Sequence, residues 1–295
     1  MKLFKIELKI ESPLVTPLKG DTIWGHFAWG IANHEGEAGV LSFIEDCKKK
    51  EPAFITSSAF PKGYICKRIP QITERKEAFS LEDYTNIKKQ KKEKYEAASP
   101  LIFIKDSEEE SVVDTNQISF KQKISTHNTI SRITGNVQEG GLYSVSELWA
   151  NQKDFDLYIL SSYSEDRILK LCEWAFENGF GADSSTGKGS ISIDIKLQEV
   201  QFKNNGNTYM ALAPFVVPDL NTIEDLRADI FVRSGKIGGA FVNELSPFKK
   251  TVILYDEGAV FRSKTSIQFI GTLLQNIHND KRICQSAFAP VIPID

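Results

Sequence analysis

The chain has 295 residues, 41% of them hydrophobic, and a formal net charge of −3 at pH 7. This apolar content excludes a disordered chain, and the length predicts two domains or one large one. The small negative charge excludes a molecule that attracts nucleic acid over its whole surface, so any polyanion site must be a local patch.

The cysteines Cys47, Cys66, Cys172 and Cys284 are scattered along the chain. None lies in a C-x-x-C pair or near a histidine at zinc-ligand spacing, which argues against a metal site. No apolar run reaches the roughly 18 residues needed to span a bilayer, and no signal peptide precedes Glu7. We therefore expect a cytoplasmic protein that uses no metal or cofactor.

Two elements are predicted at the start of the chain. Residues 2–11 alternate between apolar and charged side chains, which predicts a strand whose polar face is either the outside of a sheet or a binding surface. After a two-proline connection, Ile23, Phe27 and Ile31 recur every four residues and predict a helix. Asp21 is a good candidate for its N-cap.

The start of this helix is also a candidate phosphate site. Lys19 and Gly20 directly precede it, and free backbone N–H groups beside a lysine can hold a phosphate. An ordinary capped helix explains the same residues. His26 lies further along and can be a general base, but a lone histidine beside two tryptophans is more often structural.

Two more helices are predicted before residue 100. Residues 38–50 form an amphipathic pattern that ends in three lysines. Residues 80–96 form a charged helix that carries the most basic run of the chain, and a solvated face and a non-specific phosphate surface both explain that run.

Residues 117–146 are predicted to form a long inserted hairpin. The segment is polar, carries Arg132 and is tipped by Ile130 and Ile133. An apolar wedge beside an arginine is suited to part stacked bases and to hold the nucleic-acid backbone. A solvent-exposed hairpin without a ligand is the simpler explanation.

A strand at 155–160, a helix at 165–178 and a strand at 190–202 follow the hairpin. Together with the first strand, the first helix and a short strand expected within 53–64, they give the order strand, helix, strand, insertion, strand, helix, strand, which is the ferredoxin-like βαββαβ order. Sheets of that fold can carry RNA on one face.

The turn-rich residues 204–207 are a sensible domain boundary. The strands and turns beyond them suggest a second, degenerate domain, which includes a second basic, glycine-rich loop with Arg233 and Lys236. The predicted fold class is therefore α+β, with two ferredoxin-like (RRM-like) domains at 1–203 and 207–295. The hairpin insertion falls at about 100–150 in the first of them.

A glycine-rich loop, Gly179–Ser190, joins the helix at 165–178 to the last strand of the first domain. Its glycines, small hydroxyl residues and Lys188 suit a cradle for phosphates. The nucleotide P-loop does not fit, because one residue too many separates Gly181 from Gly187 and because Gly189 stands where Ser or Thr should hold magnesium. The order, helix to strand, is also reversed. A plain flexible connection is the remaining alternative.

Several motifs occur in a specific order. They are the glycine loop before the last strand, and the segments Leu18–Gly25, Ile130–Gly135, and Arg233–Gly235 followed by Tyr255–Phe261. In this order they resemble the RAMP family of CRISPR proteins, in the branch of the fourth Csm subunit of type III-A effector complexes. The resemblance spans nearly the whole chain.

The resemblance implies a non-catalytic subunit that grips the repeat-derived 5′ tag of CRISPR RNA (crRNA) in defence against foreign nucleic acid. It implies a large polymerase-nuclease subunit and an adjacent backbone RAMP subunit as protein partners, with target RNA contacted indirectly by a thumb hairpin. The glycine loop differs from the family pattern, since Lys188 is its one cation where relatives often carry more. The candidate RNA-binding residues are Lys19, Gly20, Asp21, Thr22, Arg132, Ile133, Gly187, Lys188, Gly189, Arg233 and Lys236.

Two alternatives remain open. The first is a metal-independent endoribonuclease that processes repeat RNA, with His26 as acid or base. The second is a scaffold whose surface for protein partners matters more than RNA, which the low net charge and apolar C-terminal segment also suit.

Overall fold

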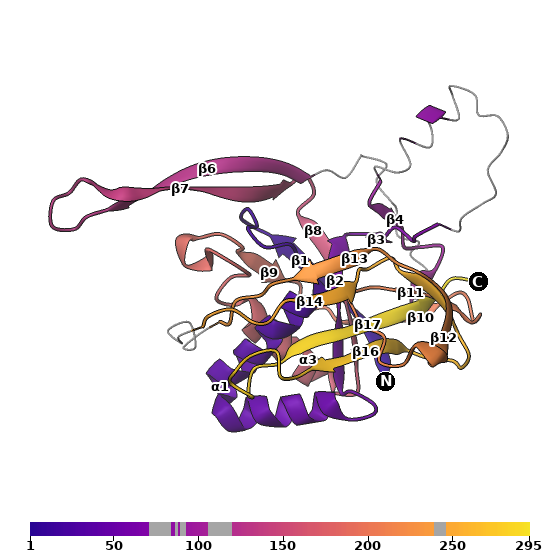
Figure 1. The fold of residues 1–295 in the computed structure, drawn as a ribbon. Coiled ribbons are helices and arrows are strands. Elements are labelled where there is room, and N and C mark those ends of the chain that lie inside the picture. The colour runs from indigo at the N-terminus through magenta and orange to yellow at the C-terminus, as the bar shows by residue number, and fades with distance from the viewer. Residues whose placement is uncertain (71–83, 86–87, 89–92, 106–119, 239–245) are drawn as a thin grey trace.

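The computed structural model describes residues 1–295 except for 71–83, 86–87, 89–92, 106–119 and 239–245 (Figure 1). Most of the charged helix predicted at 80–96 lies outside the described residues. Its last residues belong to a short strand, β4 (Tyr95–Ala97), paired with β3 (Tyr64–Cys66), so the predicted helical end is wrong.

The first half of the chain forms an antiparallel sheet. Its strand order is β2-β8-β1-β10-β5, and β9 pairs with β1 beside β10. The strands are β1 (Lys2–Ile10), β2 (Phe54–Pro61), β5 (Ile102–Ile104), β8 (Asp154–Ser161), β9 (Ile191–Ile193) and β10 (Gln198–Phe202). The single strand predicted at 190–202 is thus two strands, because β9 and β10 pair with different ends of β1.

Two helices, α1 (Gly20–Lys48) and α3 (Glu165–Phe176), pack against each other and against this sheet. Gly30 lets them approach, because a Cβ there would lie 2.9 Å from the Trp174 backbone. The two helices predicted at 21–32 and 38–50 join at a kink at Gly36, whose φ of 71° breaks the helical path. None of the described helices is long and apolar enough to cross a membrane.

On the polar face of β1, Lys5 is buried, whereas Glu7 is half-buried and Lys9 is exposed, so this face is open only toward the end of the strand. Lys5 lies 3.5 Å from Asp156, and both residues are buried. The Gly63 N–H donates to the same carboxylate over 2.9 Å.

The second half forms another antiparallel sheet, in the order β12-β15-β11-β17-β16. Its strands are β11 (Thr208–Ala211), β12 (Ile223–Arg227), β15 (Val260–Ser263), β16 (Phe269–Leu274) and β17 (Gln285–Pro293). Residues 226–233 are divided between the end of β12 and β13 (Ile230–Arg233), which forms a separate ribbon with β14 (Val252–Tyr255). Short 3₁₀ turns lie at Ser184–Thr186 and Leu220–Thr222.

The two halves share one apolar core. Met210, Leu212 and Phe288 of the second sheet belong to the same buried cluster as Phe27 of α1 and Phe54 of β2. The opposite face of the second sheet has a smaller cluster of its own. The turn predicted as a boundary, at 204–207, is present, but apolar packing is continuous between the two sides. The division into domains at 203 and 207 stays a prediction.

Candidate nucleic-acid interface

A long hairpin projects from the body of the molecule (Figure 1). It consists of β6 (Phe120–Ile130) and β7 (Val137–Ala150), which stay paired from Phe120 and Ala150 at the base to Ile130 and Val137 near the tip. The register slips between Asn128 and Ile130, opposite the left-handed Gly140 (φ 72°). The predicted hairpin is therefore confirmed as an element, and it extends to Ala150, beyond the predicted end at 146.

One face of the hairpin combines aromatic and basic side chains. Directly opposed residues share a face, so Lys121 and Trp149 lie together, and so do His127 and Tyr143. Trp149 is 43% exposed and Tyr143 50% exposed. The Lys123 Nζ lies 5.8 Å from the Trp149 ring, and the His127 and Tyr143 rings stack at 5.5 Å. Such a face suits stacking of bases beside phosphate contacts.

The tip and the opposite face of the hairpin carry exposed aliphatic side chains. Ile124, Ile130 and Leu142 are exposed, and at the tip Ile133 is 97% exposed beside Arg132. No carboxylate among the described residues pairs with Arg132. The predicted wedge and arginine are therefore both presented to solvent.

The base of the hairpin is fixed to the glycine loop. The backbones of Leu14 and Leu148 exchange hydrogen bonds of 3.0 and 2.7 Å. The Lys188 Nζ lies 2.6 Å from Glu147 Oε1, and the Trp149 Nε1 donates to Glu147 Oε2 over 3.1 Å. Glu147 is 1% exposed. The hydrogen bond from Lys188 lowers its pKa to about 2, so this carboxylate is ionised at neutral pH.

The glycine loop itself is anchored. Gly187 and Gly189 adopt left-handed φ of 84° and 67°. A Cβ at Gly189 would lie 2.0 Å from the Phe180 carbonyl oxygen, so the backbone packs closely there. The Ala182 N–H donates to Thr16 Oγ1 and the Gly189 N–H to the Pro13 carbonyl, over 3.0 and 2.9 Å. The loop is thus held in place, unlike a plain flexible connection.

His26 supports this loop from α1. Its Nε2 accepts a hydrogen bond of 3.1 Å from the Gly181 N–H, and its ring lies 4.6 Å from that of Phe180. Burial lowers the pKa of His26 to about 4, although a hydrogen bond with the Ala175 backbone opposes the shift. His26 is therefore neutral at pH 7 and occupied as an acceptor, as expected of a structural histidine.

The start of α1 carries a buried network of charges. The Lys19 Nζ lies 2.7 Å from Asp256 Oδ1 and 2.6 Å from Glu257 Oε1. Burial lowers the pKa of Lys19, but the two carboxylates outweigh it, so the pKa is raised. Burial raises the pKa of Glu257 to about 7 against the opposing charge of Lys19. The Lys19 charge is thus largely compensated inside the protein.

Asp21 is not the N-cap, which corrects the sequence-based assignment. Lys19 occupies that position and makes no side-chain cap. The Asp21 carboxylate instead accepts two hydrogen bonds from Arg233, of 2.6 and 2.7 Å, and one of 3.2 Å from Gln285. The Gly20 N–H donates to Ser58 Oγ over 3.0 Å. Because Arg233 and Gln285 come from the second half, the start of α1 joins the two halves.

The sequence matches a known protein family. The model of the RAMP superfamily matches residues 13–192, more than half of the chain. The chain belongs to the RAMP superfamily. A comparison with curated protein sequences found no match.

The RAMP fold is shared with solved chains of type III effector complexes. A chain of the crystal structure "Csm1-Csm4 cassette in complex with pppApA" has a TM-score of 0.60 and 12% identity, with 100% of this chain and 98% of that chain covered. A chain of the "Csm3-Csm4 subcomplex in the type III-A CRISPR-Cas interference complex" has a TM-score of 0.55 and 13% identity, with 100% of both chains covered. The predicted resemblance to type III RAMP proteins is thus confirmed for family and fold.

The predicted RNA-binding residues of this RAMP chain fall in separate places. Lys19, Gly20, Asp21, Thr22 and Arg233 gather at the start of α1. Gly187, Lys188 and Gly189 lie at the hairpin base, and Arg132 and Ile133 lie at its tip. Lys236 is exposed on another loop, 5.3 Å from the Phe248 ring.

Sequence reasoning missed the residues that give the hairpin its two faces. Trp149, Tyr143 and His127 carry the aromatic face, and Glu147 anchors its base. The signal was present, because Tyr143, Glu147 and Trp149 all have odd numbers on one strand, which places them on the same side of it. Pairing them with Lys121 required the register, which the sequence alone does not provide.

Proposed function

We propose that this chain is a non-catalytic RNA-binding subunit of a type III-A CRISPR effector complex. In this role it binds the repeat-derived 5′ tag of crRNA and connects the large polymerase-nuclease subunit to the backbone RAMP subunits. Membership of the RAMP superfamily and the fold shared with chains of Csm1–Csm4 and Csm3–Csm4 complexes support the proposal. Two ferredoxin-like domains, the second degenerate, are the ancestry that we propose for its two sheets.

The aromatic and basic face of the hairpin is the observation that carries the RNA-binding role. Lys121 and Lys123 alternate along one strand, opposite Trp149 and Glu147 on the other. Bases stack on exposed aromatic rings while lysines meet phosphates, and neither contact depends strongly on sequence. With Arg132 and Ile133 at the tip, the hairpin acts as a thumb that inserts beside the guide–target duplex.

The tag is proposed to lie along the glycine loop and the start of α1. Lys19, Arg233 and Lys188 each already face a carboxylate within 2.7 Å. A phosphate arriving there competes with Asp256, Asp21 or Glu147, so each cation adds less than an unpaired one would. Gly187 and Gly189 contribute close backbone approach. We therefore expect the hairpin to supply more of the salt-dependent affinity than the loop.

The geometry of His26 favours the non-catalytic role over the endoribonuclease. A general acid or base must reach the scissile phosphate and change its protonation state near neutral pH. His26 has a pKa lowered to about 4, and its Nε2 accepts the Gly181 N–H. If the chain is non-catalytic, His26→Ala removes the acceptor of the Gly181 N–H hydrogen bond, and no RNA-cleaving activity is lost.

The first experiment is affinity purification of the tagged chain from its native cell, with sequencing of the RNA that accompanies it. We expect short RNAs that share one constant 5′ end, together with a large partner protein. A complex that contains the partner but no RNA would instead support the scaffold alternative. An RNA-free monomer would overturn the proposal, and His26 would then be tested for ribonuclease activity.

A matched pair of variants tests the thumb. Arg132→Ala at the hairpin tip should weaken RNA binding for all sequences alike and reduce the slope of log K against log salt by about 1. Lys50→Ala, which removes an exposed lysine at the far end of α1, should change neither quantity. Equal effects of the two substitutions would refute a specific role for the tip.

A further inference from the structure

Strand β9 has a free edge. Its backbone bonds to β1 through even-numbered residues, since the Glu11 N–H donates to the Ser190 carbonyl and the Asp194 N–H to the Glu7 carbonyl, over 2.8 and 2.9 Å. Antiparallel pairing alternates, so the N–H and C=O groups of Ile191 and Ile193 point away from β1. Among the described strands, only β1 pairs with β9. This edge therefore offers an unused hydrogen-bonding template.

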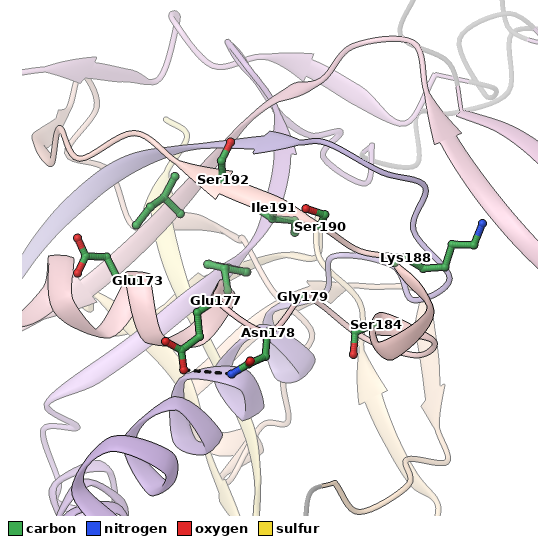
Figure 2. Close-up of a pocket in the computed structure, with 12 residues that line it drawn as sticks. Glu173, Glu177, Asn178, Gly179, Ser184, Lys188, Ser190, Ile191 and Ser192 are labelled. Carbon is green, nitrogen blue, oxygen red and sulfur yellow. Dashed lines mark hydrogen bonds between the residues drawn. The ribbon is translucent and has the colours of Figure 1, made fainter.

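A groove of about 550 Å³ runs along this edge (Figure 2). Glu173 and Glu177 of α3 lie on one side of it, and Ser190, Ile191 and Ser192 lie on the other. Ile191 and Phe176 are buried and give the groove an apolar floor. The groove therefore places an apolar floor beside the strand edge.

The groove is acidic. Its lining includes the exposed carboxylates of Glu173 and Glu177 and one cation, Lys188. The Lys188 side chain points away from the other lining residues in Figure 2, and its Nζ lies 2.6 Å from Glu147. Glu173 is thus left to attract a positive partner and to repel phosphates, and Glu177 adds its charge although it already accepts a hydrogen bond from Asn178 and lies 2.8 Å from His34 Nε2.

We propose that this groove binds an extended, lysine- or arginine-rich segment of a partner polypeptide, which adds a strand to the free edge of β9. Main-chain hydrogen bonds to Ile191 and Ile193 supply affinity, and the carboxylates of Glu173 and Glu177 select basic side chains. The proposal goes beyond the RNA-binding role and does not depend on it. The groove shares Gly187 and Lys188 with the proposed RNA site, but its carboxylates disfavour a phosphate there.

The test uses the full chain and a synthetic heptapeptide of alternating lysine and valine, compared with a glutamate–valine heptapeptide and a single-stranded RNA oligonucleotide. We expect only the lysine peptide to slow hydrogen exchange at the amides of Ile191 and Ile193. Protection of these amides by the RNA, or by the glutamate peptide equally well, would overturn the proposal. So would the absence of protection by the lysine peptide at saturation.

Substitutions locate the binding. Glu173→Lys should weaken the lysine peptide about fivefold, whereas Glu165→Lys at the other end of α3 should leave its affinity unchanged. Ile193→Pro removes an N–H that faces the groove and not β1, so it should weaken binding while Ile193→Val does not. Equal loss in Glu173→Lys and Glu165→Lys would show non-specific attraction and refute the site. Because Glu173 is exposed, that comparison stays decisive even if Ile193→Pro unfolds the chain.

Discussion

Three of the cations that the sequence marks as phosphate ligands are paired with carboxylates within the protein. Lys19 faces Asp256 and Glu257, Arg233 faces Asp21, and Lys188 faces Glu147. Their carboxylate partners come from distant parts of the chain, so no local motif reveals them. At the residue scale these ion pairs hold distant elements together, and an RNA phosphate that binds one of these cations must compete with its carboxylate partner.

The pair of Asp21 and Arg233 gives a stability prediction. Asp21→Asn removes the charge that accepts both Arg233 hydrogen bonds and leaves a partly buried guanidinium unpaired. We expect the free energy of unfolding to fall by about 2–3 kcal/mol, measured by urea titration. Asp225→Asn breaks an exposed pair with Arg262 and should cost less than about 0.5 kcal/mol. Similar costs for both would show that the buried pair does not hold the two halves together.

His26 gives a pH prediction. Its folded pKa of about 4 lies below the usual histidine pKa of 6.5, because burial disfavours the protonated ring. Its contribution to stability is therefore present above pH 6.5 and is lost as the pH falls toward 4. An NMR titration of the histidine rings should give one resonance with a pKa near 4 that is missing in His26→Gln. A His26 pKa near 6.5 would contradict the buried acceptor role.

At the scale of elements, the glycine loop and the hairpin form one unit. The loop binds the 13–16 segment, which in turn pairs with the hairpin base through Leu14 and Leu148. The ion pair of Lys188 and Glu147 closes the same contact. The angle of the hairpin therefore depends on the loop, although the two are separated by a strand and a helix in the sequence.

The two glycines of the loop differ in a way that can be measured. Gly187→Ala places a side chain at a φ of 84° with open space around it, and should cost about 1–2 kcal/mol. Gly189→Ala also drives its Cβ to 2.0 Å from the Phe180 carbonyl oxygen, so it should cost about 3 kcal/mol or more. Urea titrations of both variants test this. Equal costs would mean that conformational strain alone, without close packing, explains the glycine at 189.

At the scale of the whole molecule, both sheets bury apolar side chains in a shared core. Phe288 and Ile292 of β17 pack in the same cluster as Phe27 of α1. Strand β17 also contacts α1 and β2 of the first half. The two halves should therefore unfold together even if they descend from separate domains.

The tryptophans allow this to be tested, since Trp24, Trp29, Trp149 and Trp174 all lie in the first half. Phe288→Ala creates a cavity in the second sheet and should lower the free energy of unfolding by about 3–5 kcal/mol. We expect the tryptophan fluorescence transition and the far-UV circular dichroism transition to shift together to lower urea. A fluorescence midpoint that does not move would show that the halves unfold independently.

The sequence by itself determined the elements with strong local patterns. The alternation of β1, the helical spacing of Ile23, Phe27 and Ile31, the projecting hairpin and the glycine loop all follow from side-chain period and turn chemistry, which act within a few residues. The ordered motifs also predicted the RAMP family. Short-range rules succeed for the strand, the helix and the hairpin because their side-chain patterns repeat over two or more turns or strand periods.

Only the tertiary structure decided which surfaces remain available. It buried Lys5 of β1, turned Asp21 from a cap into a partner of Arg233, and left one edge of β9 unpaired. It also placed Trp149 opposite Lys121 on the hairpin. Each of these outcomes depends on contacts between residues far apart in the chain, and charge pairing and burial are set by such contacts rather than by local sequence.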